Sequence, residues 1–401
     1  MGDFRVIGLI GAGHLISHFL QLTLPPLFPL LRSELDVSWA ALGVVSSVFY
    51  GASGLAQTVA GFFVDRLGAR RVLLAGMTVM GLAIALAGLT SSYWMLLAAA
   101  ALAGLGNSVF HPADYSILNS TVGARRIARA YSVHAISGNL GWVLAPIVVG
   151  TVTHLAGWRV ALLTAGGLAL LGTLVLATQT RGLGAAMAGT TPAASRPSVA
   201  ADLRVLLAVP IMMAFGYFAL LTASTTGIQT FAVPALGLIY DAPLTVATGA
   251  LTVYLFANAT GILAGGFLAD RASRHDVVAA TGVTCAAALM LTLASGRPPL
   301  SAIAVVMAAT GFSMGITAPS RDMLVRAATP RGSSGKVFGF VYSGLDLGSL
   351  VAPPVYGWLL DRGEPRAMFA VVAALMFVMI LTVIQVRRRV VPATAPAAGG
   401  S

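Results

Sequence analysis

Long apolar runs recur along the whole chain, and they limit its fold more than any other feature. A helix needs about 20 apolar residues to cross the hydrocarbon core of a bilayer. Twelve segments satisfy this requirement, at 6–31, 40–64, 72–90, 93–120, 129–155, 158–179, 204–231, 244–269, 277–295, 299–326, 336–360 and 366–386. The sequence therefore predicts an all-α polytopic membrane protein with 12 transmembrane helices.

The composition excludes a soluble domain. Of the 401 residues, 57% are hydrophobic and 9% are charged, whereas soluble domains carry about 25% charged residues. The net charge of +11 does not indicate a nucleic-acid partner, because the basic residues stand in short clusters between the apolar runs. The single cysteine, Cys285, excludes a disulfide within the chain and suggests no cysteine metal site.

The basic clusters predict how the chain crosses the membrane. With the N-terminus inside, 18 of the 24 Lys and Arg residues fall on the cytoplasmic side of the predicted helices. Because cytoplasmic loops carry an excess of Lys and Arg, we expect both termini in the cytoplasm and the protein in the inner membrane. The first apolar segment is too long for a cleaved signal peptide, so we expect it to be retained as a helix.

The chain divides into two halves that repeat. We expect a six-helix half at 1–180, a cytoplasmic linker at 181–203, a second six-helix half at 204–389 and a disordered tail at 390–401. A shift of 207 residues places Pro112 on Pro319 and Pro146 on Pro353. Two such repeats are the architecture of a transporter whose halves rock about a central site.

A charged loop follows the second predicted helix and carries the most specific motif in the chain. It reads Gly61-Phe-Phe-Val-Asp65-Arg66-Leu-Gly-Ala-Arg70, with a weaker copy that begins at Gly266. Glycine would let two helices approach closely, and aspartate would cap a helix start. These residues resemble the signature loop of the major facilitator superfamily, and the resemblance covers the whole chain. It implies a gating loop formed by Gly61, Asp65, Arg66, Arg70, Asp270 and Arg271.

The fifth predicted helix contains the run Gly141-Trp-Val-Leu-Ala145-Pro146-Ile-Val-Val-Gly150. This run is similar to the motif of the family's antiporters, with Ala145 where glycine is usual. The similarity implies that glycine and proline bend and pack this helix, and it favours export. Small residues at this spacing also serve plain helix packing. We expect helix bends at Pro112, Gly141, Pro146, Pro319 and Pro353.

A looser resemblance connects the first and fourth predicted helices to the fosmidomycin-resistance type of exporter. It rests on the Gly-His pair at His14 and on the Phe-His-Pro run that ends at Pro112. The chain departs from that group at His18 and Ala113, where acidic residues are expected, so its substrate is not carried over.

The fourth predicted helix carries ionisable side chains within its apolar run. His111 and Asp114 stand three residues apart, so both project from one face of a helix. Pro112 between them cannot donate a backbone hydrogen bond and would loosen the helix there. Because a charged side chain at the bilayer centre costs about 2.5–3.5 kcal/mol, we expect this pair to bind protons or substrate. The alternative is that Asp114 only ties its helix to a neighbour.

Further histidines stand on the first and fifth predicted helices. His14 and His18 are four residues apart, and two histidines at this spacing can bind a metal ion. No third ligand is evident from the spacing, so we expect no metal and interpret both as groups that line the cavity. His134 and Asn139 are similarly placed. The chain contains no phosphate-binding glycine loop, which argues against ATP as the energy source.

Arg321 and Asp346 are the candidates in the second half. A guanidinium that faced the cavity would bind an anionic substrate or hold a carboxylate as a releasable partner, whereas a snorkelling Arg321 would reach the membrane surface. The adjacent Asp322 points about 100° away on a helix, so the two residues are not an obvious pair. Asp346 lies among small residues that let another helix approach.

These features predict a secondary active transporter and not an enzyme. The leading hypothesis is a proton-coupled antiporter that exports a small organic compound across the inner membrane. One alternative is a proton-coupled symporter that imports an organic anion such as a carboxylate, and another is a membrane sensor of the same fold that does not transport. We expect a monomer whose partners are the small-molecule substrate, protons and the lipid bilayer, with no cofactor and no nucleic acid.

Overall fold

The computed structural model describes residues 2–123, 125–180, 206–272, 274–328 and 334–390. The predicted linker at 181–203 lies outside the described residues, as does the predicted tail beyond Val390. The described helices are α1 (Asp3–Gln21), η1 (Pro25–Leu27), α2 (Phe28–Leu35), α3 (Trp39–Leu67), α4 (Ala69–Ala87), α5 (Tyr93–Asn107), α6 (Phe110–Thr121), α7 (Ile127–Ala156), α8 (Trp158–Gln179), α10 (Val209–Tyr240), α11 (Leu244–Arg271), α12 (His275–Ala294), α13 (Leu300–Ala328), α14 (Ser334–Asp361) and α15 (Pro365–Val390).

Eleven segments of the described chain are long and apolar enough to cross a membrane. The remaining predicted span, at 336–360, is helical as α14, and several side chains near its start lie outside the described part of the chain. A helix bonds its backbone amides internally, which is the condition for crossing lipid as a separate segment. The prediction of an all-α polytopic membrane protein is confirmed.

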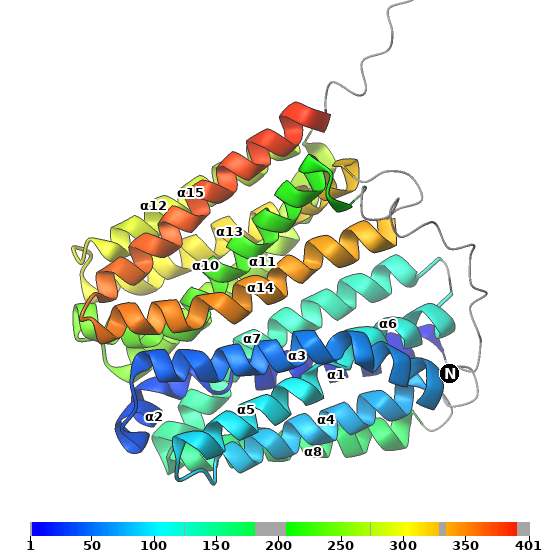
Figure 1. Cartoon of the computed structure of the whole chain (residues 1–401), viewed down its shortest axis with the longest axis horizontal. Helices are drawn as coiled ribbons and strands as arrows, with labels where there is room; N and C mark the ends of the chain where they lie inside the picture. The colour runs from blue at the N-terminus through cyan, green and yellow to red at the C-terminus, as the bar shows by residue number, and fades with distance from the viewer. Residues whose placement is uncertain (1, 124, 181–205, 273, 329–333, 391–401) are drawn as a thin grey trace, which may run out of the picture.

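The helices form two bundles, which we call the N half (α1 to α8) and the C half (α10 to α15). In Figure 1 the N half, coloured blue to green, lies below the C half, coloured green to red. In the N half α1 packs on α7 and α4 packs on α8, and in the C half α11 packs on α13 and α10 on α14. The first helix begins and the last helix ends toward the right-hand end of the molecule in Figure 1.

The predicted span at 6–31 lies within one apolar span, Asp3–Leu35, but its helix is interrupted. This segment is divided into α1, η1 and α2, with α1 ending at Gln21 and η1 beginning at Pro25. Proline has no N–H to bond to the carbonyl four residues earlier, and its ring clashes with that carbonyl. For Pro25 that carbonyl belongs to Gln21, which explains why α1 ends there.

The predicted helix at 93–120 is also interrupted. It consists of α5 and α6, which are separated by Ser108 and Val109. Pro112 stands at the third position of α6, so its ring excludes the helical hydrogen bond to the carbonyl of Ser108. The loosening that the sequence predicted at Pro112 therefore takes the form of a break one turn before it. Pro146, Pro319 and Pro353 lie inside α7, α13 and α14, and bends there stay predictions.

The two halves touch mainly through α3 with α14 and α7 with α11. The side-chain contacts lie toward the end of the molecule that the basic residues predict to be outside. The Asp361 carboxylate accepts hydrogen bonds from the backbone amides of Trp39 and Ala40, each at 2.8 Å. Further along the same helix pair, the hydroxyl of Ser47 donates to the carbonyl of Leu350 at 2.5 Å. A residue of the C half thus caps the first turn of an N-half helix.

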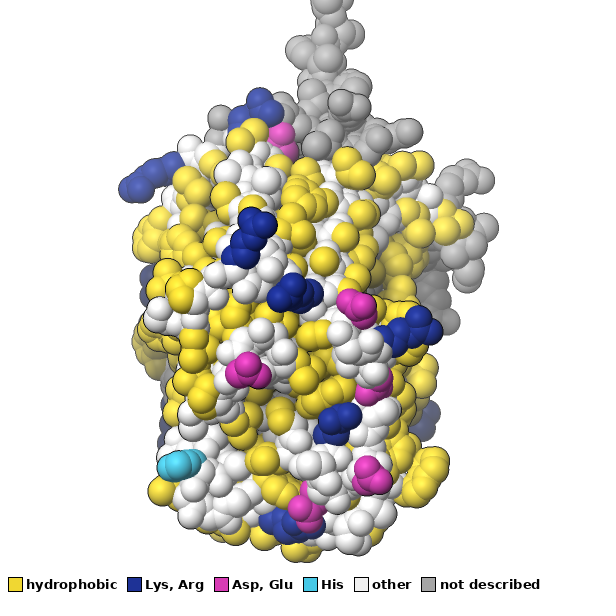
Figure 2. Space-filling model, turned by 90° about the vertical axis from the view of Figure 1, so that its left-hand side faces the viewer, with side chains coloured by type: hydrophobic (Ala, Val, Ile, Leu, Met, Phe, Trp, Pro, Cys, Tyr) yellow, Lys and Arg dark blue, Asp and Glu magenta, His cyan; other side chains and the backbone are white. Residues whose placement is uncertain are grey.

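Figure 2 looks onto this predicted outer end, which is the left-hand end of Figure 1. Acidic and basic side chains are scattered over it among apolar ones, and neither sign forms a continuous patch. The mixture agrees with the sequence, in which the large excess of basic residues belongs to the opposite ends of the helices. The predicted outer end therefore has no extended patch of positive or of negative charge.

We expect Asp361→Ala to weaken the contact between the halves by about 1 kcal/mol, the usual cost of losing a helix N-cap. Because this cap exists only while the halves touch, the population with separated outer ends should rise about fivefold. Double electron–electron resonance between spin labels at Ser91→Cys and Arg297→Cys, in a Cys285→Ser background, measures that population. Glu364→Ala is the control, since this exposed carboxylate has no hydrogen-bond partner for its side chain among the described residues. Equal distance distributions in both variants would contradict the prediction.

Candidate functional site

A buried carboxylate surrounded by histidines forms the polar centre of the N half. Asp114 on α6 has no exposed side-chain surface, and its Oδ2 lies 3.0 Å from Nε2 of His134 on α7. The same oxygen lies 3.6 Å from Nδ1 of His14 on α1. We call these residues, together with His18 and His111, the histidine cluster. The structure thus brings together five candidates that the sequence placed on three separate helices.

Helical spacing explains how each member reaches the cluster. His14 and His18 are one turn apart on α1, and their ring centroids are 4.3 Å apart. His134 stacks on His14 with a centroid distance of 3.6 Å and an interplanar angle of 20°. The ring of His111 lies 5.5 Å from that of His14, so α6 contributes both of its predicted residues. That His111 and Asp114 bind protons or substrate stays a prediction.

The two α6 residues differ in exposure. Asp114 is buried between helices, whereas the side chain of His111 is exposed and stacks with Tyr115 at a centroid distance of 6.1 Å. Nδ1 of His14, Nδ1 of His18 and Oδ1 of Asp114 are buried without a hydrogen-bond partner among the described residues. A buried polar atom without a partner costs about 1–3 kcal/mol, so these atoms favour the uptake of a ligand or proton.

Two groups of three side chains have donor atoms close enough to one another for a metal site. One group is His14, His18 and His111 and the other is His14, Asp114 and His134, each with its atoms within 4.8 Å of one another. The third donor that the sequence did not reveal therefore comes from another helix. In the second group, however, the ring planes of His14 and His134 are stacked within 20° of parallel. Lone pairs that lie in two such separate planes do not converge on one nearby point, as the ligands of a tetrahedral zinc ion do.

The sequence analysis missed a polar network beside the cluster. Asn107, the last residue of α5, accepts hydrogen bonds from Ser17 at 2.9 Å and Gln21 at 3.0 Å, and donates to Ser53 at 2.9 Å. The available signal was an amide side chain at the end of an apolar run, immediately before the break that Pro112 imposes. The cluster is thus attached to α3 and α5 through neutral side chains.

The predicted role of Asn139 has no support from its contacts. Its Nδ2 donates to the carbonyl of Ala135 in its own helix at 2.9 Å.

Gly141, predicted as a bend, lies where α7 closely approaches α1. A Cβ added there would meet the carbonyl oxygen of Leu15, and it would lie 2.8 Å from the backbone nitrogen of Phe19.

In the C half, Arg321 and Asp322 form a pair that their positions in the sequence did not make obvious. Arg321 Nε donates to Asp322 Oδ1 at 2.9 Å, with side-chain exposures of 18% and 42%. The Arg321 side chain is long enough to reach Asp322 although the two Cβ atoms point about 100° apart around the helix. The guanidinium carbon also lies 4.7 Å from the ring centre of Phe218. Arg321 is therefore held inside the C half.

Asp346 lies between the two halves and not within the C half alone. A Cβ added at Gly54 of α3 would stand 3.4 Å from the Cβ of Asp346. The absence of a side chain at Gly54 lets α14 bring this carboxylate against the N half. Asp346 thus faces the helix that also contacts Asn107, while Arg321 and Asp114 stay in separate halves.

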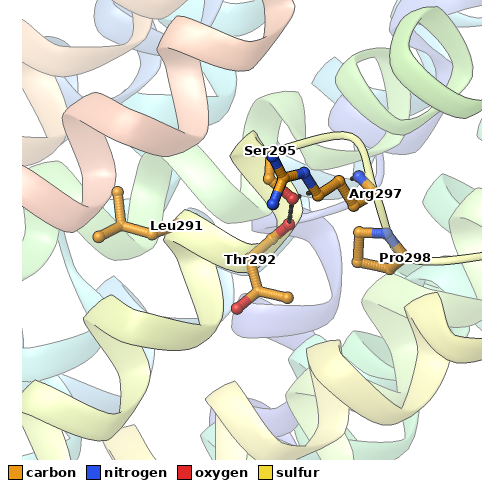
Figure 3. A pocket seen from close by; sticks show the side chains of 5 residues that line it. All are labelled: Leu291, Thr292, Ser295, Arg297 and Pro298. Carbon is orange, nitrogen blue, oxygen red and sulfur yellow. Dashed lines mark hydrogen bonds between the residues drawn. The ribbon is translucent and has the colours of Figure 1, made fainter.

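A surface hollow of about 570 Å³ is remote from these residues. It is lined by Leu291, Thr292, Ser295, Arg297 and Pro298 at the end of α12 and in the following loop. Figure 3 shows two hydrogen bonds that shape this turn, in which Ser295 donates to the Thr292 carbonyl and accepts from the Arg297 amide. These bonds lie within the turn itself. Because the hollow is remote from the histidine cluster, we assign it no part in the candidate site.

A sequence model of the Major Facilitator Superfamily matches residues 10–238 and 214–400. The chain belongs to the major facilitator superfamily. Its family and fold are those of membrane transporters, which are not enzymes.

The chain is similar to several members of the superfamily. It is 31% identical over 288 residues to the fosmidomycin resistance protein of Escherichia coli (strain K12), covering 69% of this chain and 68% of that protein. It is 24% identical over 172 residues to the probable sulfoacetate transporter SauU of Cupriavidus necator, covering 43% and 40% of the two chains. A solved bacterial homologue of the human lysosomal transporter Spinster, inward-facing and unoccupied, has a TM-score of 0.79 at 14% identity, with 98% and 99% of the chains covered. The last similarity shows the fold.

In the superfamily's signature loop, the described side-chain hydrogen bonds come from Arg70. Arg70 donates to the carbonyl of Ala177 at 2.7 Å and to the Thr180 hydroxyl at 2.9 Å, so it caps the end of α8. The residue before α4 is Gly68, with φ of 87°. The side chains of Asp65 and Asp270 lie outside the described part of the chain.

The remaining predicted gating residues make few contacts. Arg66 and Arg271 are exposed, and a Cβ at Gly61 would meet nothing within 4 Å. Close helix approach at Gly61 is therefore not seen. In the second-half loop, hydrogen bonds to Asp276 raise the pKa of Arg274.

We expect Gly141→Ala to destabilise the protein by about 1–3 kcal/mol, because its methyl group would force α7 away from α1 at the histidine cluster. Gly167→Ala is the matched control, since a Cβ at this helical glycine would meet nothing within 4 Å. That change should stabilise the protein by about 0.5–1 kcal/mol through the lower backbone entropy of alanine. Thermal unfolding in detergent measures both, and effects of the same sign would contradict the close approach.

Proposed function

We propose that the protein is a proton-coupled antiporter that exports a small organic compound across the inner membrane, with both termini in the cytoplasm. The observation that carries the proposal is the fully buried Asp114 carboxylate in contact with His134 and His14. Both of its described ion-pair partners are histidines, whose charge changes within the physiological pH range. A lysine or arginine partner would instead hold a permanent charge.

Burial makes the charge of Asp114 depend on its surroundings. An isolated carboxylate in an apolar interior is so costly that it either takes up a proton or pairs with a cation. A proton on His134 supplies the cation, and a proton on Asp114 removes the anion. Because His14, His18 and His111 stand close by, positive charges on several rings would repel one another. The cluster therefore holds few protons at a time, and its occupancy responds to a nearby charge.

The exposure of His111 supports alternate occupation by proton and substrate. His111 is exposed while Asp114 lies buried behind it. A substrate that binds beside His111 therefore contacts the exposed side of the histidine cluster, whose buried side holds Asp114. In exchange transport, binding of one ligand must disfavour the other, and linkage makes that effect reciprocal. A cluster with one exposed and one buried member fits this requirement.

The direction of transport is supported by sequence similarity. The fosmidomycin resistance protein is 31% identical to this chain over 69% of its length, and the run from Gly141 to Gly150 resembles the motif of the family's antiporters. The excess of basic residues in the predicted cytoplasmic loops supports the proposed orientation.

The test begins with a thermal-shift screen of the purified protein against metabolites and antimicrobials, because a ligand of the folded state raises its stability. A hit is then followed in proteoliposomes with an imposed pH gradient. Antiport accumulates the solute on the acidic side. We expect Asp114→Asn to lower this accumulation by about 5–150-fold, the range of typical coupling energies. Exchange down the solute's own gradient should persist.

His154→Gln is the control for this experiment, since His154 is exposed on α7 and remote from the cluster in sequence. Proton-driven accumulation that is unchanged in Asp114→Asn would remove the coupling assignment. Accumulation on the alkaline side would show symport instead of antiport.

A second candidate function is proton-coupled import of an organic anion. It is favoured by Arg321, whose side chain is 18% exposed and whose guanidinium contacts Asp322 and Phe218. A carboxylate or sulfonate could replace Asp322 as the partner of this guanidinium. The relative named as a probable sulfoacetate transporter is consistent with an anionic substrate.

For this second function we expect Arg321→Ala to weaken binding of an anionic hit by about tenfold or more, since a charge-assisted hydrogen bond is lost. Arg321→Lys should retain part of the affinity because the positive charge remains. Isothermal titration with purified protein measures both, with Arg297→Ala in the exposed outer loop as control. Equal affinity in all variants would exclude Arg321 from the binding site.

A further inference from the structure

A directed chain of hydrogen bonds crosses the N half beside the histidine cluster. Trp142 Nε1 donates to Gln21 Oε1 at 3.2 Å, and Gln21 Nε2 donates to Asn107 Oδ1 at 3.0 Å. Asn107 Nδ2 then donates to the hydroxyl of Ser53 at 2.9 Å. The chain begins next to the cluster, since the rings of Trp142 and His18 are 4.4 Å apart. It joins α7, α1, α5 and α3 in that order.

The chemistry of tryptophan determines the direction of this chain. An indole N–H only donates, so Gln21 must present its carbonyl oxygen to Trp142 and its NH₂ group to Asn107. Asn107 must then present its oxygen to Gln21 and its NH₂ group to Ser53. Ser17, which lies one turn before Gln21, donates to the same oxygen at 2.9 Å. Reversal of either amide would place like groups against each other, so the orientation of Asn107 is unique.

Asn107 also lies where α5 and α3 are in closest contact. A Cβ at Gly104, one turn earlier on α5, would meet the backbone carbonyl of Phe49. The Asn107 to Ser53 bond stands one turn further along the same pair of helices. The other face of α3 touches the C half, where Gly54 adjoins Asp346. A movement of α3 relative to α1 would therefore alter the contact between the halves.

The break after α5 increases the importance of this side chain. Because Pro112 removes a helical bond across Ser108, the backbone does not hold α6 rigidly to α5. The bonds of Asn107 to α1 and α3 fix the end of α5 in place of a continuous helix. His111 and Asp114 lie within two turns of Asn107 in the sequence, and so their position relative to α3 depends on Asn107.

We infer that Asn107 is a positioning residue that couples the histidine cluster to the contact between α3 and the C half. Its oriented amide holds α3 in register with α1, so a change in the protonation of the cluster is transmitted to the interface beside Asp346. This inference rests on the proposed function for the protonation step. The residues around Asp114 with ionisable side chains are His14 and His18 on α1, His111 and Tyr115 on α6, and His134 on α7.

The test measures how pH changes the arrangement of the two halves. Spin labels at Arg125→Cys and Val277→Cys, both exposed, report the distance between the halves in a Cys285→Ser background. Double electron–electron resonance in proteoliposomes is recorded between about pH 5 and about pH 8, the range in which histidine changes charge. In the parent protein we expect the ratio of the two distance populations to change about tenfold.

Asn107→Leu, which keeps the size but removes every hydrogen bond, should reduce this change to less than about twofold. Trp142→Phe removes only the donor that orients the chain, and it should reduce the change in a protein whose packing is preserved. This second variant decides the test if Asn107→Leu does not fold. Asn258→Leu is the matched control, because Asn258 also joins two helices, donating to the Gly311 carbonyl at 3.2 Å, but lies in the C half.

The outcomes separate the inference from the proposed function. If Asp114→Asn abolishes the pH response and both Asn107→Leu and Trp142→Phe retain it, the inference is wrong while the coupling site stands. If Asp114→Asn leaves the response unchanged, the response arises at Asp346 or elsewhere and the proposed coupling site is wrong. Loss of the response in Asn258→Leu as well would show a general effect of removing a buried amide, and this also overturns the inference.

Discussion

The burial of one carboxylate inside a membrane protein is the constraint on which the rest of this structure depends. Asp114 has no exposed surface, and lipid offers no water or counterion to compensate its charge. The described partners within reach are imidazoles from two other helices. Holding them there requires α1, α6 and α7 to meet closely, which explains why small residues such as Gly138 and Gly141 face the rings and backbone of α1.

The two halves have the same plan but use their polar residues differently. In the N half the ionisable side chains of several helices converge on one centre. In the C half Arg321 pairs with its neighbour Asp322, while Asp346 stands at the border with α3. The helix α3 is therefore the element that both sites share, because one face bonds to Asn107 and another touches α14. A transporter that rocks about a central site needs such an element to connect binding with movement.

The agreement between sequence and structure follows the strength of each physical signal. Apolar runs of about 20 residues are a strong signal, and the all-α polytopic fold was predicted from them. The breaks at Pro25 and Pro112 were harder to place, because a proline loosens a helix at the carbonyl four residues earlier and the sequence does not say whether the chain bends or separates. The pairing of Arg321 with Asp322 was not obvious for a related reason. Cβ directions on a helix do not limit where a long, flexible side chain places its charge.

The sequence by itself determined the class of protein, the repeat and most of the residues in the candidate site, since burial in lipid makes every polar residue conspicuous. It also placed His14, His18, His111, Asp114 and His134 on three helices. Only the tertiary structure decided that these five meet, that Asn139 turns to its own helix, and that Asp346 faces the other half. The physical reason is that a helix which is apolar on nearly every face carries little periodicity to reveal its rotation. Which of its polar side chains point toward one another is settled by packing between helices, and packing is a property of the whole chain.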